Sequence, residues 1–124
     1  MLVFLNMTSN SATFTNLRPS KKWNTATLER SNLVYRNGAD AGVLYNIHID
    51  EFTDNFHVCD SGSILRRDGT FIVGNEPFNA QEKLTVNNPN PGDKLEKLTV
   101  KVYDMSSGDL ATISNPFYLQ IRFD

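Results

Sequence analysis

The sequence contains a single cysteine, Cys59, so no disulfide bond can form within the chain. The fold must therefore be held together by packing, and a reducing compartment is favoured as the place where the chain folds or assembles. The chain also lacks an apolar run of about 20 residues, the length that a membrane-spanning helix needs. Residues 1–5 are apolar, but no basic region precedes them and Asn6 interrupts them, so we expect no signal peptide.

Positive and negative charges are nearly balanced in this sequence. Its formal net charge is −2, and its longest basic runs are the pairs Lys21-Lys22 and Arg66-Arg67. Proteins that bind nucleic acid through general electrostatics, or that dock on anionic membranes, need a basic patch or stripe. We therefore expect neither kind of partner.

Motifs of the common enzyme classes are missing as well. There is no glycine-rich phosphate loop and no nucleophile elbow. His57 and Cys59 have the chemistry of a base and a nucleophile, but no third group stands at a recognisable spacing, and a lone cysteine is more commonly a small buried apolar residue. His48, Asp50 and Glu51, taken with His57, have no diagnostic metal-ligand spacing. We expect no catalytic residue, no cofactor and no metal site.

The segment 104–109 has a faint likeness to a calcium-binding loop, with Asp104, Ser106 and Gly108 at alternating positions and Asp109 directly after them. The bidentate glutamate that completes such a loop is absent further along the chain. Gly108 is equally suited to an ordinary turn, and the sequence therefore predicts a turn here.

The clearest pattern in the sequence is an alternation of apolar and polar residues near its end. It runs through 98–103 and again through 117–123, with a polar break between the two runs. A side-chain period of two is typical of a strand with one buried and one solvent-facing side. The two runs predict two strands that pair antiparallel across a turn. The apolar positions on the expected inner faces are Leu98, Val100 and Val102, followed by Phe117, Leu119, Ile121 and Phe123.

Shorter strand-like segments occupy most of the remaining chain. Segment 20–31 stays open between one or two helical turns and an extended strand. Asn37-Gly38 and Asp68-Gly69 are strong turn signals. The expected strands lie near Leu2, Phe14, Tyr35, Ile47, Ile64, Phe71, Val100 and Leu119, and a ninth is conceivable at Leu84. This spacing predicts one domain, 1–124, built as an antiparallel β-sandwich of about eight strands, for which a single jelly roll is one arrangement.

The end of the chain also resembles a known family. The segment Lys94–Asp104, followed by Gly108 and then by Pro116–Ile121, is similar to the closing strands of jelly-roll capsid proteins and minor virion proteins of double-stranded DNA viruses. The likeness covers the last quarter of the chain and differs at Asn115-Pro116. It implies a structural virion protein that acts by assembly with other capsid subunits or with itself, located in the virion and without catalytic residues.

Candidate contact residues follow from this hypothesis. The apolar stretch Leu2, Val3, Phe4 and Leu5 could form an arm, and the loops around Trp23 and 87–92 could contact a neighbouring subunit. Tyr103 and Tyr118 fall on the expected solvent-facing sides of their strands. Exposed aromatic residues mark protein contacts more often than sugar sites. The alternative hypothesis is a carbohydrate- or receptor-binding module of a fibre or adhesin, which would bind glycan.

Overall fold

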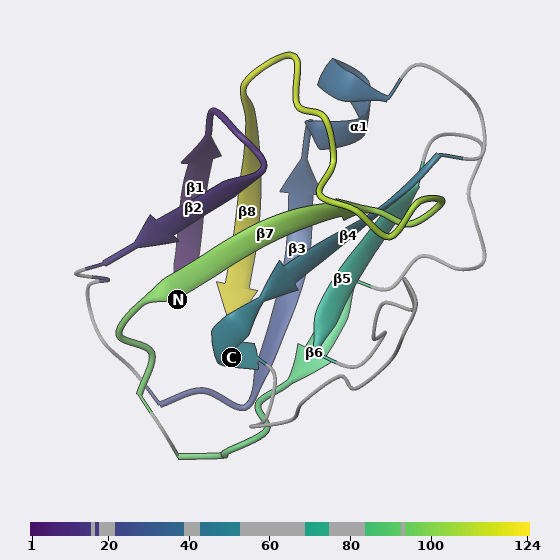
Figure 1. Cartoon of the computed structure of the whole chain (residues 1–124). Coiled ribbons are helices and arrows are strands. Elements are labelled where there is room, and N and C mark those ends of the chain that lie inside the picture. The colour runs from purple at the N-terminus through teal and green to yellow at the C-terminus, as the bar shows by residue number, and fades with distance from the viewer. Residues whose placement is uncertain (16, 18–21, 39–42, 53–68, 75–83, 93) are drawn as a thin grey trace.

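A computed structural model describes residues 1–15, 17, 22–38, 43–52, 69–74, 84–92 and 94–124. Within these residues the chain forms eight strands and two short helical segments (Figure 1). The strands are β1 (Leu2–Met7), β2 (Ser11–Phe14), β3 (Thr25–Ser31), β4 (Leu44–Ile49), β5 (Thr70–Gly74), β6 (Thr85–Asn87), β7 (Leu98–Asp104) and β8 (Phe117–Phe123). The helical segments are α1 (Leu33–Asn37) and the 3₁₀ turn η1 (Asp50–Phe52).

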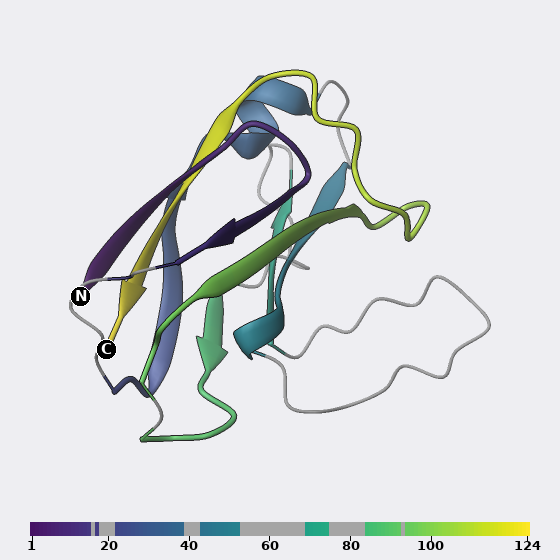
Figure 2. The same ribbon diagram turned by 60° about the vertical axis from the view of Figure 1, so that its left-hand side comes forward.

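The strands make two four-stranded antiparallel sheets, which form the two layers visible in Figure 2. One sheet has the order β1-β8-β3-β6 and the other has the order β2-β7-β4-β5. The first strand thus pairs with the last, the second with the seventh, the third with the sixth and the fourth with the fifth. This nested pairing is the connectivity of a jelly roll. The predicted antiparallel β-sandwich is confirmed.

The core lies between the two sheets and is built from the alternating residues of the strands. On β8 the residues Phe117, Leu119, Ile121 and Phe123 are buried, and the residues between them are at least partly exposed. On β7 the same holds for Leu98, Val100 and Val102. Each sheet therefore contributes one apolar face, as the period-two pattern predicted.

The prediction that β7 and β8 pair with each other is wrong. β7 lies between β2 and β4, and β8 lies between β1 and β3 in the opposite sheet. Paired neighbours in a hairpin are usually joined by two to five residues. The connection here, 105–116, is longer and carries the chain from one sheet to the other. The two apolar faces consequently meet across the core instead of lying side by side.

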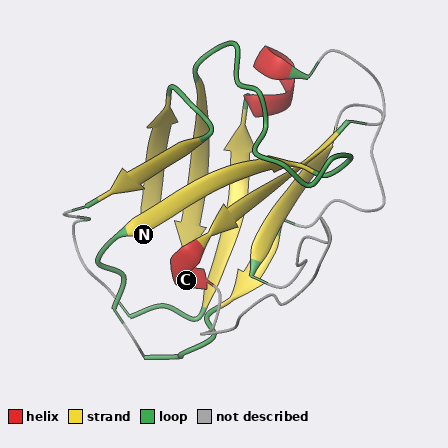
Figure 3. Cartoon of the chain, in the orientation of Figure 1, coloured by secondary structure: helices red, strands yellow, loops and turns green. Residues whose placement is uncertain are grey.

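The strand expected near Tyr35 is also wrong, because 33–37 is the single helical turn α1 (Figure 3). Leu33 is fully buried, while Tyr35 is 87% exposed. The Leu33 backbone N–H donates to the Ser31 hydroxyl at the start of the turn, over 3.1 Å. Asn37 donates from its amide to the carbonyls of Leu33 and Asn115. These side-chain bonds favour a turn over the extended conformation that Leu33-Val34-Tyr35 would otherwise prefer.

Asn37-Gly38 does not form the expected hairpin turn. Asn37 ends α1, and Gly38 is extended, with a φ of −85°. The Gly38 N–H donates to the carbonyl of Val34 and closes the helical turn. No helix in the described part of the chain has both the length and the apolar character needed to cross a membrane.

The open question about segment 20–31 is settled in favour of a strand for its second half. β3 buries Ala26 and Leu28, while Thr25 and Thr27 alternate with them. The pairing with β8 shifts between Leu28 and Arg30, which is the signature of a β-bulge. The strand expected near Ile64 lies outside the described residues, and so do Asp68, His57 and Cys59.

Shortening one inward side chain of β8 tests this architecture. Leu119→Ala should lower the free energy of unfolding by about 2–5 kcal/mol, because Leu119 is fully buried and its loss leaves a cavity. Gln120→Ala, on the other face of the same strand, should cost about 0.5 kcal/mol or less. Urea unfolding of both variants measures the difference. Equal losses would contradict the assignment of the inward face.

Candidate interaction surface

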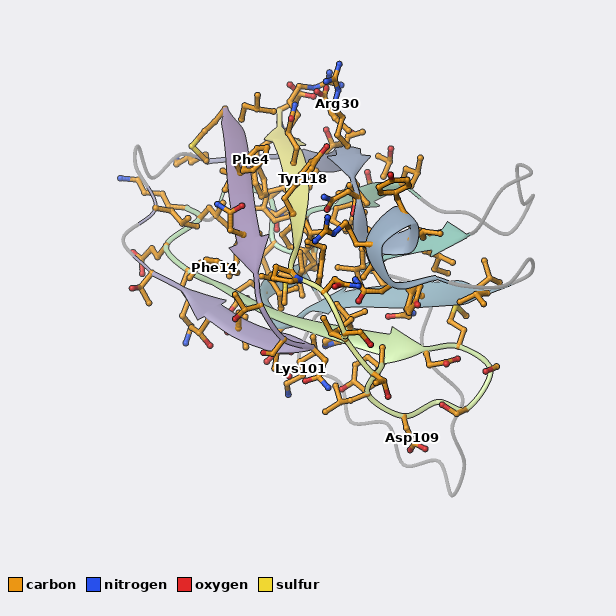
Figure 4. All side chains as sticks on the ribbon, turned by 90° about the horizontal axis from the view of Figure 1, so that it is seen from above. Phe4, Phe14, Arg30, Lys101, Asp109 and Tyr118 are labelled. Carbon is orange, nitrogen blue, oxygen red and sulfur yellow. The ribbon has the colours of Figure 1, made fainter. Side chains whose placement is uncertain are left out.

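Three apolar or aromatic side chains gather on the outer face of the sheet that holds β1 and β8. We call Leu2, Phe4 and Tyr118 the β1–β8 patch. Leu2 is 57% exposed and Phe4 is 54% exposed. The rings of Phe4 and Tyr118 stack with centroids 4.8 Å apart and planes 18° from parallel (Figure 4). Such a ring pair on an outer face is suited to contact with a partner.

The antiparallel register of β1 and β8 explains why the residues of this patch lie next to one another on one face of the sheet. Leu2 is opposite Arg122, Phe4 is opposite Gln120, and Asn6 is opposite Tyr118. Phe4 and Tyr118 are therefore diagonal neighbours on one face, at a separation that aromatic side chains can bridge. The even-numbered residues of β1 face outward because the odd-numbered ones fill the core.

A charged group borders the patch on the side of β3. Arg122 pairs with the Glu29 carboxylate, and its Nε lies 3.1 Å from Oδ2 of Asp124. All three side chains are at least partly exposed, so these ion pairs contribute little to stability. They do hold the guanidinium toward β3, on the side of β8 that faces away from β1.

The remaining expected contact residues at the start of the chain point elsewhere. Leu5 is only 2% exposed and belongs to the core, and Val3 is partly buried and packs against the core. The stretch 2–5 is thus not a free arm but the first part of β1. It divides into an inward pair, Val3 and Leu5, and an outward pair, Leu2 and Phe4.

Trp23 lies in the core, where its side chain is out of reach of a partner. It is 4% exposed, and its ring centroid is 4.9 Å from that of Phe52 and 5.4 Å from that of Phe123. Asn88, from the loop 87–92, donates from its amide to the Trp23 carbonyl over 2.8 Å. Because Asn88 is itself buried, its side chain holds the backbone at Trp23 in place through a hydrogen bond inside the protein.

Tyr103 lies on the outer face of the opposite sheet, beside His48. The two rings meet edge to face, with centroids 6.2 Å apart. His48 Nε2 is 3.0 Å from Oδ1 of Asp50. Tyr103 and Tyr118 therefore belong to two different surfaces, and the structure does not bring them together.

Burial is the largest influence on His48 and lowers its pKa below the usual 6.5. The Asp50 carboxylate raises this pKa by its charge and by a hydrogen bond, but it does not fully offset the burial. Lys101 also lowers the pKa and Glu51 raises it, both more weakly. The fold therefore favours the neutral imidazole.

Glu51 has a structural contact that the sequence did not suggest. Its carboxylate accepts a hydrogen bond from the Thr99 backbone N–H at 2.6 Å and another from the Thr99 hydroxyl at 3.0 Å. β4 ends at Ile49, opposite Val100, and η1 turns the chain away. The carboxylate thus replaces the backbone acceptor that β4 no longer offers to β7. The described residues contain no group of three or more His, Cys, Asp or Glu side chains arranged to hold a metal ion.

The segment 104–109 forms the expected turn. The Asp104 Oδ1 accepts hydrogen bonds from the Ser106 backbone N–H at 2.8 Å and from the Ser106 hydroxyl at 2.6 Å. The hydrogen bond to the Ser106 side chain is the main reason that the pKa of Asp104 lies below its usual value. Gly108 has a φ of +79°, a left-handed conformation that glycine adopts without strain.

Comparisons with protein-family models, with curated proteins and with solved structures gave no match for this chain.

Sequence reasoning included Leu2, Phe4 and Tyr118 among the contact residues but could not separate them from Leu5 and Trp23. The signal for β1 was present in its alternation, because Val3, Leu5 and Met7 share one side of a strand. It was obscured because the opposite side, Leu2 and Phe4, is apolar as well. Nothing in the sequence indicated that Arg122 would pair with Glu29, 93 positions earlier in the chain.

The lowered pKa of His48 predicts a dependence of stability on pH. A histidine that is held neutral in the fold stabilises the protein fully above its unfolded pKa of about 6.5 and loses this contribution as the pH falls through the folded pKa. His48→Gln should therefore flatten the decline of the unfolding free energy below about pH 6.5, as measured by urea titrations at a series of pH values. Identical slopes for the two proteins in that range would contradict the effect of burial.

Proposed function

We propose that this chain is a structural subunit that acts by assembly with other protein subunits, as a capsid or capsid-associated protein of a virion. The observation that carries the assembly part is the β1–β8 patch. Leu2 and Phe4 expose more than half of their surface on the outer sheet face, and Tyr118 extends this surface across the neighbouring strand. A cluster of this kind on a sheet face is suited to docking against another protein.

The patch fits repeated weak contacts better than one strong contact. Full burial of a Leu or Phe side chain is worth roughly 1.5–3 kcal/mol, so covering the exposed half of each contributes about 1 kcal/mol. Such an increment is small for a pair of molecules that meet once. It becomes decisive when many copies meet in a closed assembly, because each further contact forms at a high effective concentration.

The virion part of the proposal rests on the resemblance of 94–121 to the closing strands of jelly-roll capsid proteins. The strand order β1-β8-β3-β6 and β2-β7-β4-β5 is compatible with it. Jelly rolls also occur in lectins and cupins, and a fold does not by itself determine a function. The resemblance is therefore the reason to prefer a virion over these other settings.

The second candidate is a carbohydrate-binding module, for which the exposed Phe4 and Tyr118 rings are the relevant feature. A sugar site combines an aromatic surface with several convergent polar groups. Here the two rings stack on each other, and the adjacent Arg122 is already paired with Glu29 and Asp124. This arrangement favours a protein partner. A glycan array probed with the purified chain separates the two hypotheses, and specific glycan binding that Phe4→Ser abolishes would favour the module.

The assembly proposal predicts a concentration-dependent oligomer that needs the patch. Light scattering coupled to size exclusion should give a mass that rises with concentration for the natural chain, and Phe4→Ser should reduce this rise because it removes exposed apolar surface. Tyr35→Ser is the matched control, since Tyr35 is an exposed aromatic residue on α1 and does not belong to the patch. Self-assembly through the patch would be contradicted if the natural chain stayed monomeric at every concentration. It would also be contradicted if the Phe4→Ser variant associated as strongly as the natural chain.

The virion assignment needs a test of its own. Mass spectrometry of intact, purified virus particles from the source of the sequence should detect peptides of this chain in a fixed ratio to a shell protein. Its absence from such particles, together with its presence in the surrounding soluble fraction, would contradict the assignment.

A further inference from the structure

β1 is an edge strand whose outer backbone groups can be identified. It lies at the end of its sheet, and among the residues that the structure describes its one strand partner is β8. Met1 and Phe123 exchange two hydrogen bonds, each 2.8 Å long, from N to O. Hydrogen-bonded and non-hydrogen-bonded pairs alternate along an antiparallel ladder. Val3, Leu5 and Met7 therefore bond to β8, while the N–H and C=O groups of Leu2, Phe4 and Asn6 point away from the sheet.

The other side of the sheet agrees with this assignment. Asp124 and Thr25 exchange hydrogen bonds of 2.9 and 3.2 Å, so the even-numbered residues at the end of the chain bond toward β3. The odd-numbered residues of β8 are thus the ones that bond to β1. Among the described residues, no hydrogen bond reaches the outward backbone groups of Leu2, Phe4 or Asn6.

The free edge of β1 lacks the devices that usually prevent strands from pairing. Edge strands are protected by charged residues, by proline, by bulges or by being very short. β1 has six residues, without a charge, a proline or a register shift. The edge strands β2 and β6 have four and three residues. On the edge strand β5, the side chains that face away from the core, Thr70 and Ile72, are already buried.

We propose that two copies of the chain pair through β1, antiparallel, about a two-fold axis at Phe4. This inference rests on the proposed function and specifies how copies would meet. In this register Phe4 is opposite its own copy, and Leu2 is opposite Asn6 in both directions. All three positions carry outward backbone groups, so three pairs with two hydrogen bonds each form. Any shift of the register reduces the number of such pairs.

A two-fold contact requires one surface to be complementary to itself, and β1 meets this condition. The two sheets join into one continuous sheet of eight strands, β6-β3-β8-β1 followed by its symmetric copy. Strands in a sheet lie about 4.8 Å apart, so the stacked rings of Phe4 and Tyr118 continue into the same pair of the second copy. The paired segments carry no charged side chain, so no like charges are brought opposite one another.

Hydrogen exchange measured by NMR at low and high protein concentration tests the pairing. The amides of Phe4 and Asn6 should exchange about tenfold more slowly, or slower still, in the concentrated sample, because they gain hydrogen bonds only between copies. The amides of Val3 and Leu5 should be protected at both concentrations, since they already bond to β8. They provide the internal control.

A pair of variants at Asn6 separates the backbone edge from the apolar patch. Asn6→Pro removes one outward N–H but leaves Leu2, Phe4 and Tyr118 in place, and proline is tolerated on the open side of an edge strand. It should lower the dimer affinity at least tenfold, while Asn6→Ala should retain it. If Asn6→Pro prevents folding, Leu2→Pro with Leu2→Ala as its control removes the equivalent N–H from the other member of the same pair.

The outcomes distinguish this inference from the proposed function. If copies associate but the Phe4 and Asn6 amides exchange as they do in the monomer, or if Asn6→Pro associates normally, the β1 pairing is overturned and assembly through the patch stands. If the chain stays monomeric at every concentration, both the pairing and self-assembly through the patch are overturned. Slowed exchange at both amides, together with loss of association in Asn6→Pro alone, supports the pairing.

Discussion

The contact between the inward faces of β7 and β8 is the constraint on which the rest of the molecule depends. Each strand lies in the interior of its own sheet, with a neighbour on both sides, and each presents an unbroken row of apolar side chains. A slip of one residue in either strand would turn the whole row toward solvent. The register of β1 and β3 is set by β8, and that of β2 and β4 by β7. The outward position of Phe4 and Tyr118 is therefore fixed by what the core requires on the opposite face.

The inner faces could be predicted from the sequence because alternation is a local property. Leu119 and Ile121 alternate with the polar residues Gln120 and Arg122, and this alternation predicts which side of the strand faces the core. The partners of a strand are not local in this sense. The sequence suggested that β7 and β8 pair because they are adjacent in the chain, but the connection 105–116 is long enough to reach the other sheet. Only the packing of both layers decides between the two arrangements.

Hydrogen bonds from asparagine side chains account for much of what could not be predicted. Segment 33–37 has the composition of a strand, yet Asn37 binds four backbone groups in α1 and in the connection before β8. Asn32 accepts a hydrogen bond from the Tyr118 N–H in the same region, at 2.8 Å. Asn88 has a comparable role at Trp23. These bonds join residues that are far apart in the chain, so no pattern of spacing indicates them. The sequence also suggested the loop around Trp23 as a contact point, whereas the Trp23 side chain lies in the core.

The nested order of the strands also determines when the molecule can be completed during its synthesis. β1 leaves the ribosome well before its partner β8, which becomes available only after residue 123 has emerged. Until then both edges of a six-residue apolar strand remain without hydrogen-bonding partners. Proteins dominated by contacts between distant residues fold on the scale of milliseconds to seconds. A nascent chain of this kind is consequently exposed to association with its neighbours on a polysome, and β1 is the segment that chaperones specific for extended apolar stretches would bind.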